Sequence, residues 1–278
     1  MNLNNYQLTI EVKNKFNTIM SQISGEEKVS ISYSYTYISG DKVCFYASVQ
    51  NKYLVIKLDD LIDETLVYAP DSTLEFVIPF GDEAVAYSPD AFKGCNHTIN
   101  IHIATIDEIY SYRNLARNPL DQRGITTYYP HVTANFETRN EAIFAVRNTI
   151  DGIKNNKGHG IWPYESWGTG ERDDAVLTLD FGRKVEVDKM ILYLRADFPH
   201  DTYWNALTIL FSDESRETAG MIKTADAQII TFNKRKVRWI KLTNLKMADN
   251  TSDFAALRQI EVYGTDCKLY SINGLQNR

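Results

Sequence analysis

One ten-residue stretch of this chain gathers the side chain types that recognise ligands. Arg195–Trp204 (RADFPHDTYW) holds an arginine, two aspartates, a histidine and three other aromatic residues. It lies between predicted strands at Met190–Leu194 and Ala206–Phe211. Segments between strands are usually small and polar, whereas this one places planar hydrogen-bonding groups beside aromatic rings. That combination suits a polar ligand with apolar faces, such as a sugar. The alternative is a loop that packs its own aromatic rings and pairs its own charges.

The composition of the 278 residues indicates a folded, mainly β protein. Hydrophobic residues make up 44% and aromatic residues 12% of the chain, with 17 Tyr and 12 Phe, and aromatic residues are enriched in strands. The net charge of −6 argues against a nucleic-acid partner, because binding to phosphates needs a basic surface. No membrane partner is expected either, since apolar runs fall well short of the roughly 20 residues that span a bilayer.

The cysteines and the first residues bear on the compartment. Cys44, Cys95 and Cys267 are odd in number, far apart and form no Cys-x-x-Cys pair, which is typical of reduced thiols rather than of a disulfide framework. The sequence does not open with a charged segment followed by an apolar core, so no secretory signal is expected. We therefore expect a cytoplasmic protein, provided that the chain begins at its natural start.

The first half is predicted to form a β-sandwich-like domain over residues 1–123. Short alternating segments such as Val29–Tyr37 have the period of half-buried strands. Helical spacing of apolar residues predicts one early helix over Val12–Ile23. A closing helix is expected at Ile106–Arg117, followed by a linker at Asn118–Thr127 that is rich in Pro, Gly and polar residues. No pattern in this half indicates a functional site.

Strands at regular spacing predict that residues 124–278 form a second β domain. A short helix or turn is expected at Thr138–Asn148, and a long loop, Ile153–Asp174, follows. Loops longer than about 12–15 residues without regular structure tend to be functional. Short alternating strands in series are typical of an antiparallel sandwich or jelly roll. We expect them at Val176–Phe181, Met190–Leu194, Ala206–Phe211, Gln228–Thr231, Val237–Thr243 and Arg258–Tyr263.

Several segments of this second half follow one another in a characteristic order. They are Ala142–Gly152, a loop tryptophan, Leu177–Gly182, Leu210–Asp213 and Ile260–Gly264. Together, over residues 128–266, they resemble the discoidin or coagulation-factor type C (galactose-binding-like) family, which includes many bacterial carbohydrate-binding modules. The resemblance implies an eight-stranded jelly roll with ligand loops at one end. The predicted fold is therefore mainly β, with two β-sandwich domains, the second a discoidin-like jelly roll.

The resemblance also implies where a ligand binds. Galactose-type members carry His-x-x-Trp in one loop, which matches His159 and Trp162. They place an Arg at a strand end, matching Arg195, and an acid some residues later, matching Asp201. Phe254 matches an aromatic residue of a third loop. An indole face stacks on the C–H face of a pyranose, and a guanidinium–carboxylate pair binds vicinal hydroxyls.

The full predicted ligand set serves a galactoside- or uronate-type glycan. It consists of His159, Trp162, Tyr164, Trp167, Arg195, Asp197 (the alternative to Asp201), His200, Asp201, Trp204 and Phe254. In the competing interpretation, Trp162 and Trp167 plug the end of the sandwich and His159 satisfies a buried backbone group.

No cofactor is predicted, but a structural calcium ion is left open. The family often holds one near an Asp-Gly turn, which is Asp151-Gly152 here, and calcium takes six to eight oxygen ligands. Asp151 and the backbone around Asn148 are candidates. The family's usual glutamate before the last strand is replaced by Gln259, and Glu261 lies two residues on, along the same strand face.

Catalysis is not favoured by any motif. The sequence has no Gly-x-Ser-x-Gly elbow, P-loop or His-Glu-x-x-His zinc site. Asp197 with Asp201, or Glu165 with Glu171, would offer a carboxylate pair for glycoside hydrolysis, but acids this close in sequence are commonly solvated. We predict a non-catalytic carbohydrate-binding protein. The alternatives are a protein–protein interaction or assembly module, including a homo-oligomer, and, less favoured, a glycoside hydrolase or lyase.

Overall fold

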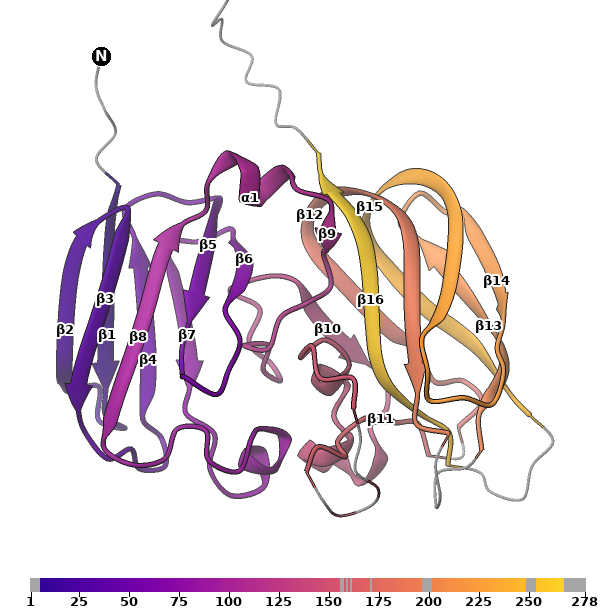
Figure 1. The fold of residues 1–278 in the computed structure, drawn as a ribbon, viewed down its shortest axis with the longest axis horizontal. Helices are drawn as coiled ribbons and strands as arrows, with labels where there is room; N and C mark the ends of the chain where they lie inside the picture. The colour runs from indigo at the N-terminus through magenta and orange to yellow at the C-terminus, as the bar shows by residue number, and fades with distance from the viewer. Residues whose placement is uncertain are drawn as a thin grey trace, which may run out of the picture.

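The computed structural model describes residues 6–155, 158, 160, 162–170, 172–196, 202–248 and 254–267. Figure 1 shows two groups of strands side by side along the long axis: an N-terminal lobe, whose strands end at Ile103, and a C-terminal lobe, whose strands begin at Arg113. The prediction of a mainly β protein is confirmed. Within the described residues, no helix combines the length and hydropathy that a membrane crossing requires.

The N-terminal lobe consists of two antiparallel four-stranded sheets. On the strand Gln7–Lys13, Leu8, Ile10 and Val12 are all fully buried, because alternate side chains of a strand point to the same face. One sheet has the order β2 (Ile19–Glu26), β1 (Gln7–Lys13), β4 (Lys42–Ala47), β7 (Thr73–Val77). The other has the order β3 (Lys28–Ser34), β8 (Asn96–Ile103), β5 (Lys52–Lys57), β6 (Thr65–Ala69).

The early helix predicted over Val12–Ile23 is wrong, because this segment forms the β1–β2 hairpin. Lys13 of β1 pairs with Ile19 of β2. The Asn14 side chain closes the turn by accepting hydrogen bonds from the amides two and four residues later, at 2.9 and 3.0 Å. Asn17 adopts a φ of 63°, a conformation that asparagine tolerates better than most residues. The apolar spacing that resembles a helix therefore runs across two strands and their turn.

The C-terminal lobe is one eight-stranded antiparallel sheet that encloses its own apolar core. On the segment Leu177–Leu194, Leu177, Leu179 and Phe181 are fully buried, as their spacing predicts. The main path of strands is β11 (Trp167–Gly168), β16 (Ala256–Asp266), β12 (Leu177–Leu194), β15 (Gln228–Met247), β13 (Trp204–Phe211), β14 (Arg216–Gly220). Two short strands pair outside this path: β10 (His131–Ala134) with β12, and β9 (Arg113–Asn114) with β16.

The closing helix of the first half is shorter than the predicted Ile106–Arg117. Helix α1 spans only Ile106–Tyr110, and Thr105 with Glu108 forms the capping box at its start. The chain then leaves the helix to form β9. Leu115, whose apolar side chain suggested a longer helix, is instead buried in the core of the C-terminal lobe. Arg113 and Asn114 pair with strand β16, and this strand pairing replaces further helical hydrogen bonds.

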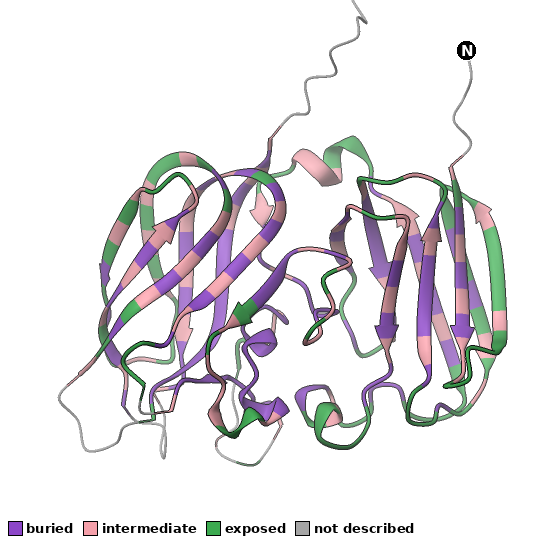
Figure 2. Cartoon of the chain, turned by 180° about the vertical axis from the view of Figure 1, so that it is seen from behind, coloured by how far each residue is buried: buried purple, intermediate pink, exposed green. Residues whose placement is uncertain are grey.

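The segment that connects the lobes contributes to both cores. Leu115 and Ala116 belong to the core of the C-terminal lobe, whereas Leu120 and Tyr128 belong to that of the N-terminal lobe. The predicted helix or turn at Thr138–Asn148 consists of three short 3₁₀ turns, and Figure 2 shows buried residues in these turns between the lobes. Their bounds are η2 (Thr138–Asn140), η3 (Ala142–Phe144) and η4 (Val146–Thr149). The domain boundary near residue 124 stays a prediction.

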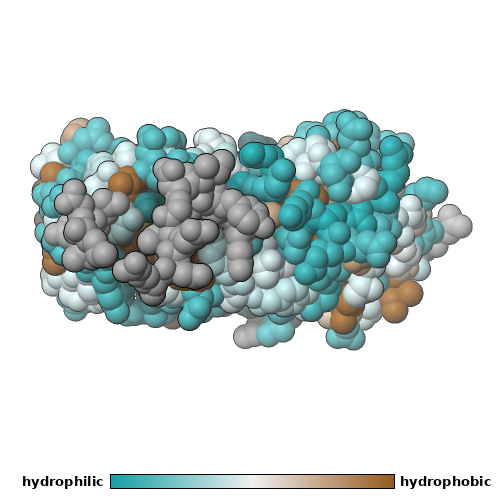
Figure 3. All heavy atoms as spheres, turned by 90° about the horizontal axis from the view of Figure 1, so that it is seen from above, coloured by the Kyte–Doolittle hydropathy of each residue, from teal (hydrophilic) through white to brown (hydrophobic). Residues whose placement is uncertain are grey.

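The two ends of the molecule differ. The lower edge of the C-terminal lobe in Figure 1 collects η2–η4, β11 and the first residues of β16, and we call it the loop end. Figure 3 views the molecule from the opposite end, where the visible described atoms are mostly hydrophilic and the apolar ones form small separate patches. The loop end is therefore the better candidate for a ligand site.

Candidate functional site

Two of the predicted ligand-contacting tryptophans are core residues. Trp167 and Trp204 are fully buried, and their ring centroids lie 6.2 Å apart. The indole N–H of Trp167 donates to the carbonyl of Phe136 at 2.9 Å, so its polar atom is satisfied inside the protein. This corrects the expectation that Trp167 and Trp204 contact a ligand. Trp167 instead plugs the end of the sandwich, as the competing interpretation proposed for it.

Arg195 is also enclosed. Its side chain has no exposed surface. Its guanidinium donates to the backbone carbonyl of Tyr164, and its amide donates to the carbonyl of Ala256 at 2.9 Å. Arg195 therefore ties the end of β12 to the loop before β11 and to the start of β16. The predicted contact between Arg195 and a ligand stays a prediction, because the adjoining residues 197–201 lie outside the described residues.

The other half of the predicted guanidinium–carboxylate clamp is not described. His159, Asp197, His200 and Asp201 lie outside the described residues. The pairing of Arg195 with Asp201 therefore stays a prediction.

Trp162 lies on a cavity of about 200 Å³ between the two lobes, which we call the Trp162 cavity. Its indole nitrogen is buried and has no hydrogen-bond partner among the residues that the structure describes. The N-terminal lobe supplies part of the wall, including Tyr87, although no pattern in that half predicted a site. The guanidinium of Arg147 stacks over the Tyr87 ring at 4.5 Å. The remaining lining residues are Leu61, Ile62, Asp63, Ala86, Ser88, Pro119, Asp151 and Ile153.

A second, open hollow lies at the loop end itself. This Phe254 pocket has a volume of about 170 Å³, and the Phe254 ring on its rim is 49% exposed. Arg139 places its guanidinium 5.0 Å from the centroid of the Phe144 ring and pairs with the exposed Glu141 through two hydrogen bonds, of 2.6 and 2.7 Å. The lining residues are Thr138, Arg139, Phe144, Gly168, Gly170, Phe254, Ala255 and Ala256.

Two glycines keep the floor of the Phe254 pocket open. A Cβ atom added to Gly168 would lie 2.7 Å from Oγ1 of Thr138 and 3.3 Å from the Phe144 ring. Gly170 has a φ of 58°, and a Cβ there would lie 3.0 Å from the Phe136 ring. Because a side chain at either position would collide with its neighbours, the shape of the pocket depends on both glycines.

Of the predicted ligand set, the structure places Phe254 in this pocket and leaves Tyr164 partly exposed. Sequence reasoning missed Thr138 and Arg139. The sequence does contain a charged pair there, Arg139 and Glu141, at the start of the segment expected to form a short helix or turn. Arg139 and Asn140 both adopt a positive φ, of 52° and 53°, which is uncommon for residues other than glycine.

The four residues considered for calcium have different partners. Glu261 is paired with Lys154 at 2.6 Å, and both polar atoms of the buried Gln259 amide lack hydrogen-bond partners among the described residues. The Asn148 amide donates to the carbonyl of Ala142 at 2.9 Å. Among the described residues, no group of three or more His, Cys, Asp or Glu side chains is arranged to hold a metal ion.

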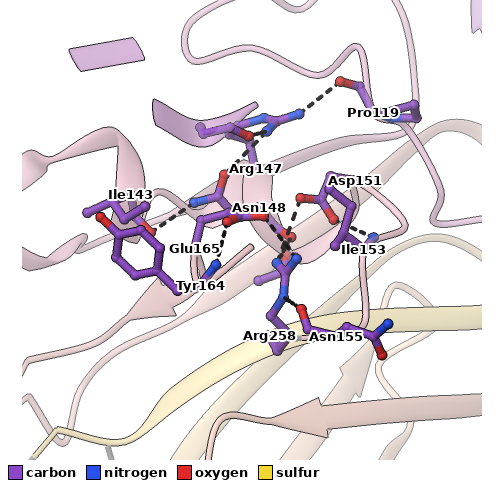
Figure 4. Close-up of polar contacts among 12 residues, drawn as sticks. Pro119, Ile143, Arg147, Asn148, Asp151, Ile153, Asn155, Tyr164, Glu165 and Arg258 are labelled. Carbon is purple, nitrogen blue, oxygen red and sulfur yellow. Dashed lines mark hydrogen bonds and ion pairs between the residues drawn. The ribbon is translucent and has the colours of Figure 1, made fainter. Parts of the chain in front are cut away.

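Asp151, the fourth of these residues, belongs to a buried ionic cluster instead (Figure 4). Its Oδ1 accepts the amide N–H of Ile153 at 2.8 Å, and its Oδ2 lies 3.7 Å from a nitrogen of Arg258. Burial raises the pKa of the Asp151 carboxyl, although the guanidinium groups of Arg258 and Arg147 oppose this shift. The same Arg258 guanidinium lies 3.0 Å from Glu165.

Comparisons with known proteins give structural neighbours only. No family model matches the sequence, and no curated protein matches it. A chitosan-binding module from a chitosanase/glucanase of Paenibacillus sp. IK-5 is 19% identical, with a TM-score of 0.39 over 54% of this chain and 98% of that one. The lectin domain of lectinolysin, complexed with Lewis B antigen, is 17% identical, with a TM-score of 0.40 over 55% and 96%.

A further neighbour is the family 32 carbohydrate-binding module of C. perfringens NanJ, in complex with galactose. It is 17% identical, with a TM-score of 0.37 over 48% of this chain and 91% of that one. These TM-scores are below 0.5, so the function of this chain is derived from its own residues. By their descriptions, the three neighbours are carbohydrate-binding modules or lectin domains.

Proposed function

We propose that this chain is a non-catalytic carbohydrate-binding protein whose site is the Phe254 pocket. The observation that carries the proposal is the exposed Phe254 ring on the rim of an open pocket. A large aromatic ring with half of its surface in water is costly to leave unpartnered. Such a ring provides a platform for the apolar C–H face of a sugar.

The polar groups around that ring suit sugar hydroxyls. The Arg139 side chain is 62% exposed, so a guanidinium edge can reach a ligand as well as Glu141. The Thr138 hydroxyl lies between Arg139 and the glycine floor. A guanidinium forms its strongest hydrogen bonds with carboxylates, so a uronate-type glycan gains most here, and a galactoside binds through its hydroxyls alone.

The size of the pocket limits what it holds. Its volume of about 170 Å³ is below the roughly 300–1,000 Å³ of typical small-molecule sites. It therefore suits one sugar unit at the end of a glycan, with the rest of the glycan in solvent.

The lining of the pocket favours binding over catalysis. None of the eight described residues that line it is acidic, whereas glycoside hydrolysis uses two carboxyl groups on either side of the scissile bond. The nearby Glu141 carboxylate is held by both hydrogen bonds from Arg139.

The test is a glycan array followed by calorimetric titration with galactosides, uronates and their oligomers. We expect Phe254→Ala and Arg139→Gln each to weaken binding of the best ligand by about tenfold or more, which corresponds to about 1.4 kcal/mol. The matched control is Phe16→Ala, which removes a 75% exposed ring from the β1–β2 turn of the other lobe. Binding that both pocket variants leave unchanged would exclude this site.

A protein–protein interaction or assembly module would use the tryptophan-rich loops as interface anchors. Trp167 and Trp204 are instead buried in the core of the C-terminal lobe. Light scattering over a range of protein concentrations measures any self-association directly, and a glycan-binding monomer would agree with the proposal.

A further inference from the structure

Arg258 is directed inward by an irregularity of strand β16. In the pairing of β12 with β16, Tyr193 lies opposite Gln259 and Leu194 lies opposite Leu257, so Arg258 has no partner residue between them. A bulge of this kind re-aims the side chain of the extra residue. The Arg258 side chain has no exposed surface, although it carries a full positive charge.

Four oxygen atoms surround the Arg258 guanidinium (Figure 4). Two are carboxylate oxygens: Nη2 lies 3.0 Å from Oε1 of Glu165, and Nη1 lies 3.7 Å from Oδ2 of Asp151. The other two are backbone carbonyl oxygens, those of Asn155, 3.3 Å from Nε, and Asn148, 3.5 Å from Nη1. Carboxylate and carbonyl oxygens are also the ligands that calcium prefers.

We infer that the Arg258 guanidinium is the resident cation of the loop end and takes the structural place that the resemblance assigns to a calcium ion. Two carboxylates and two guanidinium groups, those of Arg258 and Arg147, meet in this buried region, and their charges cancel. A calcium ion added to the same oxygens would leave an excess of two positive charges in the interior, which is strongly unfavourable.

The cluster also positions the loop before β11. The second oxygen of Glu165 accepts the amide N–H of Tyr164 at 2.8 Å, and the Tyr164 carbonyl accepts the guanidinium of Arg195. Arg258 therefore acts, through Glu165, as a positioning residue for a loop that also contacts β12. At the loop end, the Arg258 side chain thus links these segments, as the resemblance implies that a calcium ion does in the family.

The experiment compares thermal unfolding of the full chain in EDTA and in millimolar calcium chloride. For the unaltered protein we expect the same Tm in both buffers and no heat of calcium binding by calorimetry. A Tm lowered by EDTA, or calcium binding to the unaltered protein, would overturn the inference, and this arm needs no variant.

The variant Arg258→Ala removes the cation and leaves its oxygen atoms in place. Breaking a buried pair costs several kcal/mol, so we expect its Tm in EDTA to fall by about 10 °C. Calcium should then restore part of the loss, because the vacated oxygens form a cation site. Equal responses of the variant and the unaltered protein to calcium would contradict the inference.

Two further variants control for folding and for loss of charge. Arg258→Lys keeps a positive charge, so it should fold and remain insensitive to EDTA and calcium even if Arg258→Ala does not fold. Lys154→Met breaks the neighbouring ion pair with Glu261 and should gain no response to calcium. A calcium response in either variant would count against Arg258 as the resident cation.

Discussion

Two arginines of the loop end make similar ion pairs at different depths. Arg139 is 62% exposed and binds Glu141, while Arg258 is fully enclosed and binds Glu165. An exposed pair is screened by water and contributes about 0–1 kcal/mol. A buried pair gains little over apolar packing, but the loss of one partner strands a charge without solvent. Depth therefore decides which arginine is free to bind a ligand and which one holds the structure.

The same contrast separates the Phe254 pocket from the Trp162 cavity. The Phe254 pocket presents an exposed aromatic ring and an exposed guanidinium, whereas the Arg147 guanidinium at the Trp162 cavity donates to the carbonyls of Pro119, Asp121 and Ala86. Polar groups whose bonds are already made inside the protein have little left for a ligand. The exposed ring and the exposed guanidinium are the reason for placing the glycan at Phe254.

The largest effect on stability is expected for Glu165→Gln. This substitution removes one charge of the buried pair and keeps the size of the side chain. Of the two carboxylates beside Arg258, Asp151, 3.7 Å away, would then remain. We expect the free energy of unfolding to fall by about 3–5 kcal/mol, measured by urea denaturation. A loss below about 1 kcal/mol would mean that burial does not make the Arg258–Glu165 pair more important for stability than the exposed Arg139–Glu141 pair.

A smaller effect is expected for Gly168→Ala, which tests the open pocket. The new Cβ would lie 2.7 Å from Thr138 Oγ1, so we expect a loss of about 1–3 kcal/mol from overpacking together with weaker glycan binding. The control is Gly220→Ala on β14, where an added Cβ meets nothing within 4 Å. It should change stability by no more than about 0.5 kcal/mol. Undiminished binding by Gly168→Ala would show that the pocket floor does not contact the ligand.

The pair of His131 and Asp121 is a buried ion pair whose charge depends on pH. Nδ1 of His131 lies 2.6 Å from Oδ1 of Asp121. Burial lowers the pKa of His131, but the hydrogen bond and charge of Asp121 outweigh it, and the net shift is upward. A raised pKa means that the folded state holds the proton more tightly than the unfolded chain. The stabilisation is therefore complete below the ordinary histidine pKa of about 6.5 and is lost as the pH rises through the higher folded value.

Urea denaturation between pH 5.5 and 9 measures this dependence. His131→Gln should flatten the decline in unfolding free energy with pH. An identical slope in the unaltered protein and His131→Gln would show that this pair does not contribute.

The strands of the C-terminal lobe were predictable because their cause is local. Leu177, Leu179 and Phe181 alternate with more polar residues, and a strand that buries one face requires that period. The bulge at Arg258 breaks the same period, and residues 256–262 are buried without interruption. An apolar pattern cannot reveal a bulge that places a charged residue in the interior, because the compensating charge, Glu165, lies far away in the sequence.

The site was only partly predictable for a related reason. Phe254 was placed through its position before the last strand, a feature of the chain itself. Whether a loop tryptophan faces solvent or the core depends on packing between distant segments, as the contact of Trp167 with Trp204 shows. The contribution of Tyr87 to the Trp162 cavity likewise arises from the docking of the two lobes, which no local pattern encodes.

The smallest effect on stability is expected for Glu141→Gln, the same substitution as Glu165→Gln made at the exposed pair. The free energy of unfolding should change by less than about 0.5 kcal/mol, because water screens the pair and solvates Arg139 after its loss. The effect on binding should depend on the ligand. Without the competing carboxylate, the guanidinium is more available to an acidic sugar, so a uronate should bind about twofold to threefold tighter.

A neutral galactoside should bind Glu141→Gln with unchanged affinity, which calorimetry measures on the same samples. Equal gains for acidic and neutral ligands would argue against a contact between Arg139 and the sugar carboxylate. If Glu141→Gln destabilised the protein as much as Glu165→Gln, Arg139 would be a structural residue. Among the described lining residues, the Phe254 pocket would then have no charged group left for a ligand.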